Sequence, residues 1–177
     1  TANIDIEKEL NGSSSVYYGL EGVYNDVRST AFRRNYINGE EEPTGTRYPD
    51  GENNYTSVAA YANYDHRFSG ELNFNAGLRY TFTRLYSTFE DTSLYHFPFN
   101  EIQINAGALN GSAGLSWNPT GKWHLRTNLS SGFRAPNLDD AGKVFDSSPG
   151  NVVVPNPGLK PEYAYSLDAG VQHKFGE

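Results

Sequence analysis

The segment LNFNAGLRYTFT, at residues 72–83, decides the fold of this chain because it alternates strictly between two kinds of side chain. Leu72 and Phe74 belong to an apolar set, and Asn73 and Arg79 belong to a polar set. Successive side chains of a β-strand point to opposite faces, so a period of two residues predicts a strand with one apolar face and one polar face.

The same alternation recurs on both sides of this segment. We predict strands, the first of them only partial, at residues 3–10, 16–24, 55–68, 72–83, 109–118, 122–133 and 163–175. These strands run to about 10–15 residues, whereas strands of soluble proteins usually contain about five or six. A tilted strand needs about 9–11 residues to cross a bilayer.

The connections between the predicted strands alternate in length. Short turns are expected at residues 11–14, 69–70 and 119–121, and long loops at residues 27–54, 87–105 and 134–161. Alternate connections of an up-and-down meander lie at opposite ends of the sheet. One end is therefore expected to carry only tight turns and the other end all the long loops.

The two predicted faces suit a membrane barrel with a wet interior. Aromatic residues are expected near the strand ends of the apolar face, at Tyr24, Tyr86, Trp117, Trp123, Phe133, Tyr163 and Phe175. The opposite face is rich in Gly, Ser, Asn, Thr and charged residues. The pattern predicts an all-β, antiparallel, up-and-down transmembrane β-barrel segment, with residues 1–177 in a single domain. A soluble antiparallel sheet gives the same alternation, but strand length and loop order favour the membrane.

About six to seven strands cannot close a large barrel, and an open sheet edge in hydrocarbon leaves backbone groups unpaired. We therefore expect partner strands from the rest of a parent chain or from another protein. The sequence begins at Thr1 and contains no Met, which suggests a processed product or a piece of a longer chain.

Composition excludes several other classes of protein. The chain contains no Cys, so it has neither disulfides nor thiolate metal sites. Its net charge of −7 and the absence of a basic stripe argue against nucleic-acid binding. No catalytic grouping of side chains and no phosphate-binding loop stand out. We expect no enzyme, no cofactor and no metal site.

Two short motifs are the most sequence-specific part of the chain, and they flank the third long loop. Their candidate residues are Phe133, Arg134, Ala135, Pro136, Asn156, Pro157, Leu159, Lys160, Pro161 and Glu162. The prolines lack a backbone donor and are expected to end strand pairing at the base of the loop. Arg134 is expected to bind a carboxylate there, either Glu162 or Asp139. These motifs either brace the loop or contact a ligand, and bracing is the favoured interpretation.

With Gly77-Leu78-Arg79-Tyr80, the two motifs make the chain resemble the C-terminal half of the β-barrel of a TonB-dependent outer-membrane receptor. The resemblance implies a 22-stranded barrel with an N-terminal plug domain, in the outer membrane of a Gram-negative bacterium. It also implies active uptake of a scarce ligand, such as an iron–siderophore or related iron complex. Outer-membrane lipid, the remaining strands, the plug and the TonB complex would be its partners. Neither the plug domain nor a TonB box is in this sequence. The alternatives are a passive porin-like or structural barrel and a soluble β-sheet binding module.

Candidate ligand contacts lie in the first two long loops. Arg33, Arg34, Tyr36 and Tyr48 could bind an anionic siderophore by charge and stacking, although a solvated loop is the favoured interpretation. The acidic residues at 40–42 and 50–52 could hold a hard cation, but a flexible acidic tip is the better interpretation.

The positions of the histidines bear on whether the loops could bind haem. In the family that the chain resembles, similar motifs of haem receptors flank a ligand-contacting His, and residues 137–155 contain none. Tyr95, His96 and Phe97 form the one candidate contact of this kind, in the second long loop. The other histidines, at positions 66, 124 and 173, are expected to face the lumen.

Overall fold

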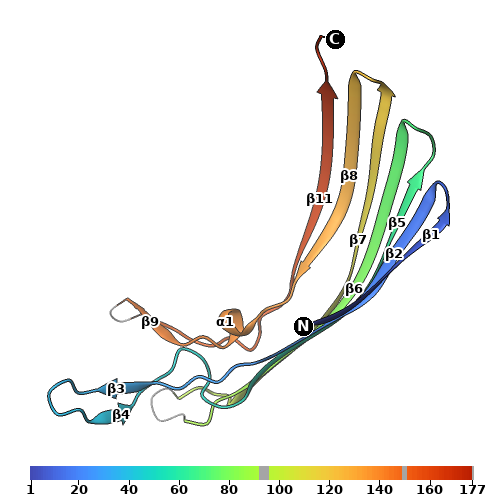
Figure 1. Ribbon diagram of the computed structural model, residues 1–177. Helices are drawn as coiled ribbons and strands as arrows, with labels where there is room; N and C mark the ends of the chain where they lie inside the picture. Colours follow the sequence, from blue (N-terminus) through green and yellow to red (C-terminus); the bar gives the residue numbers. More distant parts are fainter. Residues whose placement is uncertain (92–95, 149–150, 177) are drawn as a thin grey trace.

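Seven antiparallel strands form one curved sheet in the computed structural model, which describes residues 1–91, 96–148 and 151–176 (Figure 1). The strands are β1 (Ala2–Asn11), β2 (Ser14–Asp26), β5 (Asn53–Arg67), β6 (Leu72–Thr88), β7 (Glu101–Thr120), β8 (Trp123–Arg134) and β11 (Glu162–His173). Each strand pairs with the next one in this order, which leaves β1 and β11 at the two edges. The predicted all-β antiparallel fold is confirmed.

Short elements occupy the long connections. They are β3 (Phe32–Arg34), β4 (Glu41–Pro43), α1 (Leu138–Ala141), β9 (Phe145–Ser148) and β10 (Asn151–Val153). The tight turns gather at one end of the sheet and the long loops at the other, as the alternation of lengths predicts (Figure 1). In the described part of the chain, no helix has the length and apolar character needed to span a membrane.

The second long loop is shorter than predicted. β6 continues to Thr88 and β7 begins at Glu101, so the loop covers residues 89–100 and the predicted range 87–105 was wrong at both ends. The alternation is hard to follow there because Leu85, Ile102 and Ile104 are apolar residues on the face that is otherwise polar. These side chains are buried, for a reason given in the next subsection.

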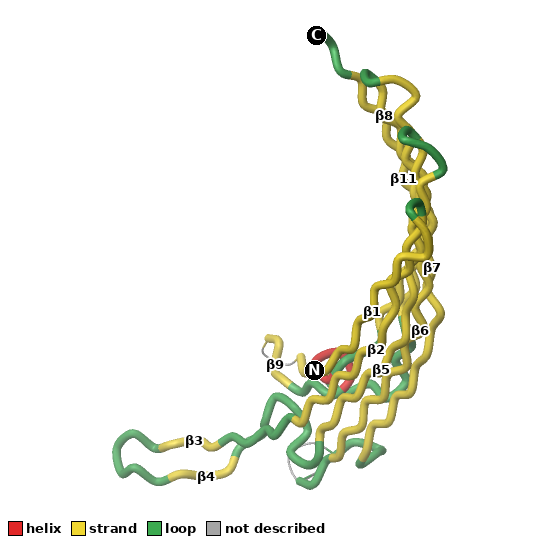
Figure 2. The backbone as a smooth tube through the Cα atoms, turned by 45° about the vertical axis from the view of Figure 1, so that its right-hand side comes forward, coloured by secondary structure: helices red, strands yellow, loops and turns green. Residues whose placement is uncertain are grey.

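The convex face of the sheet is a continuous apolar surface. The strand register places Leu20, Ala60, Tyr80 and Leu109 in one row across β2, β5, β6 and β7. Of these side chains, Leu109 is 66% exposed, and other leucines of this face are similarly open. α1 lies on the opposite, concave side (Figure 2). An exposed apolar surface of this extent marks an interaction with protein or lipid.

Aromatic side chains border this apolar surface at both ends. Phe133 and Tyr163 pair across β8 and β11 at the loop end, with ring centroids 5.6 Å apart. Trp123 contacts His173 at the turn end, with ring centroids 4.2 Å apart and the ring planes tilted by 49°. The predicted arrangement of aromatic residues near strand ends is present in the structure.

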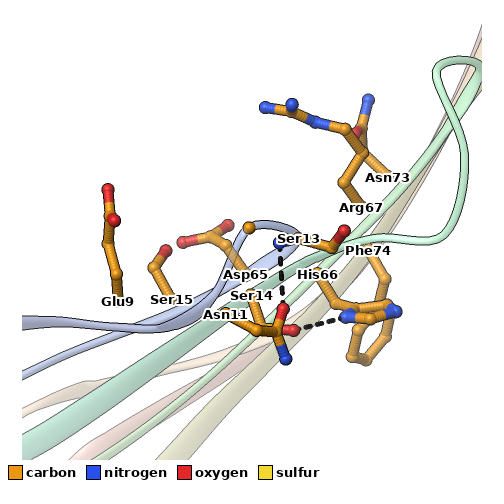
Figure 3. A pocket seen from close by; sticks show the side chains of 11 residues that line it. Glu9, Asn11, Ser13, Ser14, Ser15, Asp65, His66, Arg67, Asn73 and Phe74 are labelled. Carbon is orange, nitrogen blue, oxygen red and sulfur yellow. Dashed lines mark hydrogen bonds between the residues drawn. The ribbon is translucent and has the colours of Figure 1, made fainter.

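Two histidines lie on the other face from the one expected. His66 pairs with Phe74, and His173 pairs with Trp123, so both belong to the convex face. Their rings contact aromatic neighbours, including Phe68 beside His66 at 4.4 Å between centroids. Figure 3 shows His66 and Phe74 on the opposite side of the strands from Arg67 and Asn73, around a hollow at the turn end. The interpretation of these two histidines as lumen residues was wrong.

Candidate functional site

An apolar cluster on the concave face holds the third long loop against the loop end of the sheet. Its buried members are Leu85, Ile102, Ile104 and Ala141. Around them pack Tyr55, Phe89, Phe99, Leu138 and Leu159. The cluster therefore joins three strands, the second loop and α1, and it explains why apolar residues replace polar ones on this part of the concave face.

α1 begins at a reciprocal cap. The Asn137 side chain accepts from the backbone N–H of Asp140 at 2.9 Å, and the Asp140 carboxylate accepts from the backbone N–H of Asn137 at 3.2 Å. This capping box satisfies two donors that a helix start leaves unpaired. The cap fixes a helix of only four residues, with Ala141 fully buried in the apolar cluster.

Arg134 joins the capped helix to the base of the loop. Its Nη2 lies 2.8 Å from both carboxylate oxygens of Asp140, and its Nη1 lies 3.4 Å from Oε2 of Glu162. The expected contact with Glu162 is present, and the expected alternative with Asp139 is not. Asp140 takes that place because the cap turns its carboxylate back toward the start of the helix.

Asp139 instead binds the first long loop. Its Oδ1 accepts from Arg47 Nη2 and from the Tyr48 hydroxyl, each at 2.9 Å, and its Oδ2 lies 3.4 Å from Lys143 Nζ. The Arg47 guanidinium and the Tyr48 hydroxyl lower the pKa of Asp139, while Asp139 raises the pKa of Tyr48. A backbone bond from Val144 N–H to the Arg47 carbonyl, at 2.8 Å, reinforces the contact.

The first loop is also fixed to the end of the sheet. Asn53, almost fully buried, donates through Nδ2 to the carbonyls of Val27 and Pro49 at 3.0 and 2.8 Å. Asp50 accepts from the backbone N–H groups of Glu90 and Asp91 at 3.0 and 2.9 Å. The oxygens that could have suited a cation at Asp50 are thus occupied by the second loop.

The predicted ligand contacts separate into two groups. Tyr48 and Phe97 line one pocket between the loops, together with Phe89, Asp91 and Val144. His96 is exposed, and Tyr95 lies outside the described residues. The structure therefore brings Tyr48 and Phe97 together, in a junction of all three loops.

Arg33, Arg34 and Tyr36 lie elsewhere, on the β3–β4 hairpin that projects away from the sheet (Figure 1). Arg33 pairs across the hairpin with Glu42, and Arg34 with Glu41, whose Oε1 lies 3.7 Å from Arg34 Nε. The Arg34 charge that was expected to attract an anionic ligand is thus balanced by Glu41.

The remaining motif residues have structural contacts. Asn156 donates its backbone N–H to the Ala141 carbonyl and accepts from Gly158 N–H, both at 2.9 Å, and Leu159 packs on the apolar cluster. Pro136 and Lys160 line a shallow pocket beside Arg134. Ala135, Pro157 and Pro161 lie in the irregular segments between α1 and the two strands.

Residues that the sequence did not single out complete the junction. Arg47 and Asp140 carry polar contacts of the junction, and Leu85, Ile102 and Ile104 carry apolar ones. The Asn-x-x-Asp spacing of residues 137–140 is the sequence feature that could have predicted the start of α1, since it is a variant of the capping box. Among the described residues, no group of three or more side chains could hold a metal ion.

Comparison with known proteins agrees with this architecture. The family model "TonB dependent receptor-like, beta-barrel" matches residues 1–177. No curated protein gives a significant match to the sequence.

Solved structures with a similar fold cover nearly the whole chain at low identity. The copper transporter OprC matches at TM-score 0.76 and 13% identity, over 97% of this chain and 26% of its own. The Serratia marcescens hemophore receptor HasR, in complex with its hemophore HasA and heme, matches at TM-score 0.69 and 17% identity. The match covers 96% of this chain and 28% of the HasR chain. The FrpB iron transporter from Neisseria meningitidis matches at TM-score 0.64 and 19% identity, over 98% of this chain and 26% of the FrpB chain. The chain thus spans about a quarter of the length of these proteins.

Proposed function

Since the chain belongs to the β-barrel family of TonB-dependent receptors, we propose that it forms part of the wall of an active transporter. This transporter lies in the outer membrane of a Gram-negative bacterium and takes up a scarce ligand, with an iron complex as the favoured cargo. The family match over residues 1–177 is the observation that carries the proposal.

The apolar convex face supports the membrane location. Leu78 and Leu129 are each 59% exposed on this face, and Leu167 is 73% exposed. Burying such side chains in lipid stabilises them by about 25 cal/mol per Å² of apolar surface removed from water. By the usual orientation of outer-membrane barrels, the tight turns face the periplasm and the long loops face outward.

The two sheet edges support a larger barrel. Within the described part of the chain, β1 and β11 each pair with one neighbour only, and their outer backbone groups need partners in a membrane. Strands from the rest of a parent chain would supply these partners, and a plug domain and the TonB complex would supply energy coupling. The proposed role is binding and transport, without a catalytic centre in this segment.

The junction of loops is the proposed ligand-facing part of this segment. The similar structures are a hemophore receptor in complex with heme, a copper transporter and an iron transporter. Tyr48 and Phe97, which line the pocket between the loops, are the favoured contacts here. We expect no haem coordination from residues 137–155, because they contain no His.

Uptake by the full-length parent protein tests the proposal. A strain lacking the protein is supplied with it, and accumulation of radiolabelled iron is measured with iron–siderophore, haem and inorganic iron as sources. Active transport predicts accumulation that is lost when TonB is deleted. Accumulation that persists without TonB would favour the passive barrel, and a protein that is monomeric and folded in water without detergent would exclude the membrane location.

A further inference from the structure

A polar hollow lies on the concave face, away from the loop junction. It covers four strands, where the register places Asn75, Gly114, Asn128 and Asp168 in one row across β6, β7, β8 and β11. The next row toward the turn end includes Arg126, paired with Ser116 on β7 and with Gly170 on β11. These residues line a hollow of about 540 Å³.

Glycines make room for the polar side chains of this hollow. A Cβ atom at Gly114 would stand 2.4 Å from Oδ1 of Asn75, and one at Gly170 would stand 2.9 Å from Nε of Arg126. Both distances are too short for a real side-chain contact. The Asn75 amide and the Arg126 guanidinium therefore occupy space that the side chain of a larger cross-strand neighbour would fill.

The two arginines in the middle of the concave face differ in their partners. Arg79 donates to Oε1 of Glu21 at 2.6 Å and to the Thr81 hydroxyl at 3.1 Å, and its guanidinium lies 5.4 Å from the ring centre of Tyr61. The guanidinium of Arg126 makes no hydrogen bond and no ion pair with any residue that the structure describes. Asp168, which lines the same hollow, accepts from the Ser166 hydroxyl at 3.1 Å.

We propose that this hollow binds a carboxylate group through Arg126. The planar guanidinium presents parallel donors that match the two oxygens of a carboxylate, and Asn75 and Asn128 can donate further hydrogen bonds from their amides. Asp168 places a negative charge in the same hollow, so a singly charged carboxylate suits the site better than a doubly charged phosphate.

The carboxylate can come from two sources. One is an Asp or Glu side chain of another segment of the same protein, held inside the barrel. The other is a small carboxylate-bearing molecule that passes along the wall. The location inside a closed barrel rests on the proposed function, but binding is measured without transport, so the two can fail separately.

The first experiment uses the full-length receptor in its membrane with the substitution Ser116→p-benzoylphenylalanine. Irradiation is expected to crosslink this position to a peptide of the same protein that contains Asp or Glu, and adding Arg126→Gln should reduce the yield at least about tenfold. A crosslinked peptide without an acidic residue would contradict the proposal.

The second experiment tests the small-molecule source with ¹³C-acetate, a singly charged carboxylate, and the purified receptor. If no crosslink forms, acetate is expected to bind, with an affinity that Arg126→Gln lowers at least about tenfold and Arg126→Lys lowers less. Arg79→Gln is the matched control and should leave binding unchanged, because Arg79 is already neutralised by Glu21. Heat-dependent migration in electrophoresis verifies that each variant is folded. Absence of both crosslink and acetate binding would overturn the proposal.

Discussion

The segment around α1 and the β3–β4 hairpin both extend from the loop end of the sheet, yet only one of them packs on it. α1 places Ala141 in a buried cluster with Leu85, Ile102 and Ile104. The hairpin presents Tyr36 and Ile37, which are 94% and 81% exposed. The difference shows that a loop of this barrel is fixed where it contributes apolar side chains to the concave face, and that charge pairs alone do not fix it.

The substitution with the largest expected effect removes a buried apolar side chain that holds α1 against the sheet. Ile102→Ala deletes most of a fully buried side chain, and such changes cost about 2–5 kcal/mol. Because the cavity lies beneath α1, we expect hydrogen exchange at the amides of Ala141, Gly142 and Asn156 to accelerate by at least about thirtyfold. The measurement is made on the full-length receptor in lipid nanodiscs.

Ile37→Ala is the matched control, since it removes the same side chain from the projecting hairpin. It should leave exchange around α1 unchanged. Equal effects of the two substitutions would mean that the apolar cluster does not hold the loop.

Removal of the helix cap has the next largest expected effect. Asn137→Ala removes the acceptor for the Asp140 N–H and should cost about 1 kcal/mol, whereas Asn137→Asp keeps an acceptor and should cost little. We expect about fivefold faster exchange at the Ala141 amide for the first variant only. The same acceleration for both variants would show that the cap bond does not stabilise α1.

Much of the sheet could be predicted from the sequence because alternation reports a local property of each strand. The phase of the alternation already placed His66 with Tyr64 and Phe68, and the pairing with Phe74 confirms that phase. Our assignment of His66 to the lumen gave more weight to its polarity than to its position in the strand.

The loop junction could be predicted only in part. Ile102 and Ile104 are apolar residues on the otherwise polar face of β7, because α1 covers them there. The sequence of β7 alone does not indicate that a helix covers this part of the strand. The contact between Arg47 and Asp139 joins residues 92 positions apart, so it depends on the whole chain path. Arg134 was singled out from the sequence as part of the motif, and its contact with Glu162 was expected, whereas its contact with Asp140 was not.

A smaller effect is expected from acidification. Arg47 and Tyr48 lower the pKa of Asp139 below its ordinary value of 3.8, so the folded contact favours the ionised carboxylate. Its contribution is therefore complete above that ordinary value and is lost as pH falls through the lowered pKa. The hydrogen bond to Asp139 raises the pKa of Tyr48 above its ordinary value, so its hydroxyl is protonated at neutral pH and can donate to Asp139.

Spin labels on two introduced cysteines can follow this contact, since the sequence of this chain contains no cysteine of its own. With labels at Thr44→Cys and Gly158→Cys, we expect a narrow distance distribution at pH 7 and a broader one once the pH falls below the lowered pKa of Asp139. Asp139→Asn should give the broader distribution at every pH. A distribution that does not change with pH in the native junction would show that Asp139 is not what joins the two loops.

The smallest effect is expected in the hairpin itself. Arg34 and Glu41 form an ion pair of 3.7 Å whose side chains are 67% and 49% exposed, and exposed pairs contribute about 0–1 kcal/mol. Arg34→Ala should therefore leave hydrogen exchange around α1 within about 0.5 kcal/mol of the native receptor. Uptake measured on the same variant separates a ligand contact from a solvated charge: lower uptake with unchanged exchange would assign Arg34 to the ligand. Faster exchange at α1 would instead couple the hairpin to the helix, and the contrast between a fixed segment and a projecting one would no longer hold.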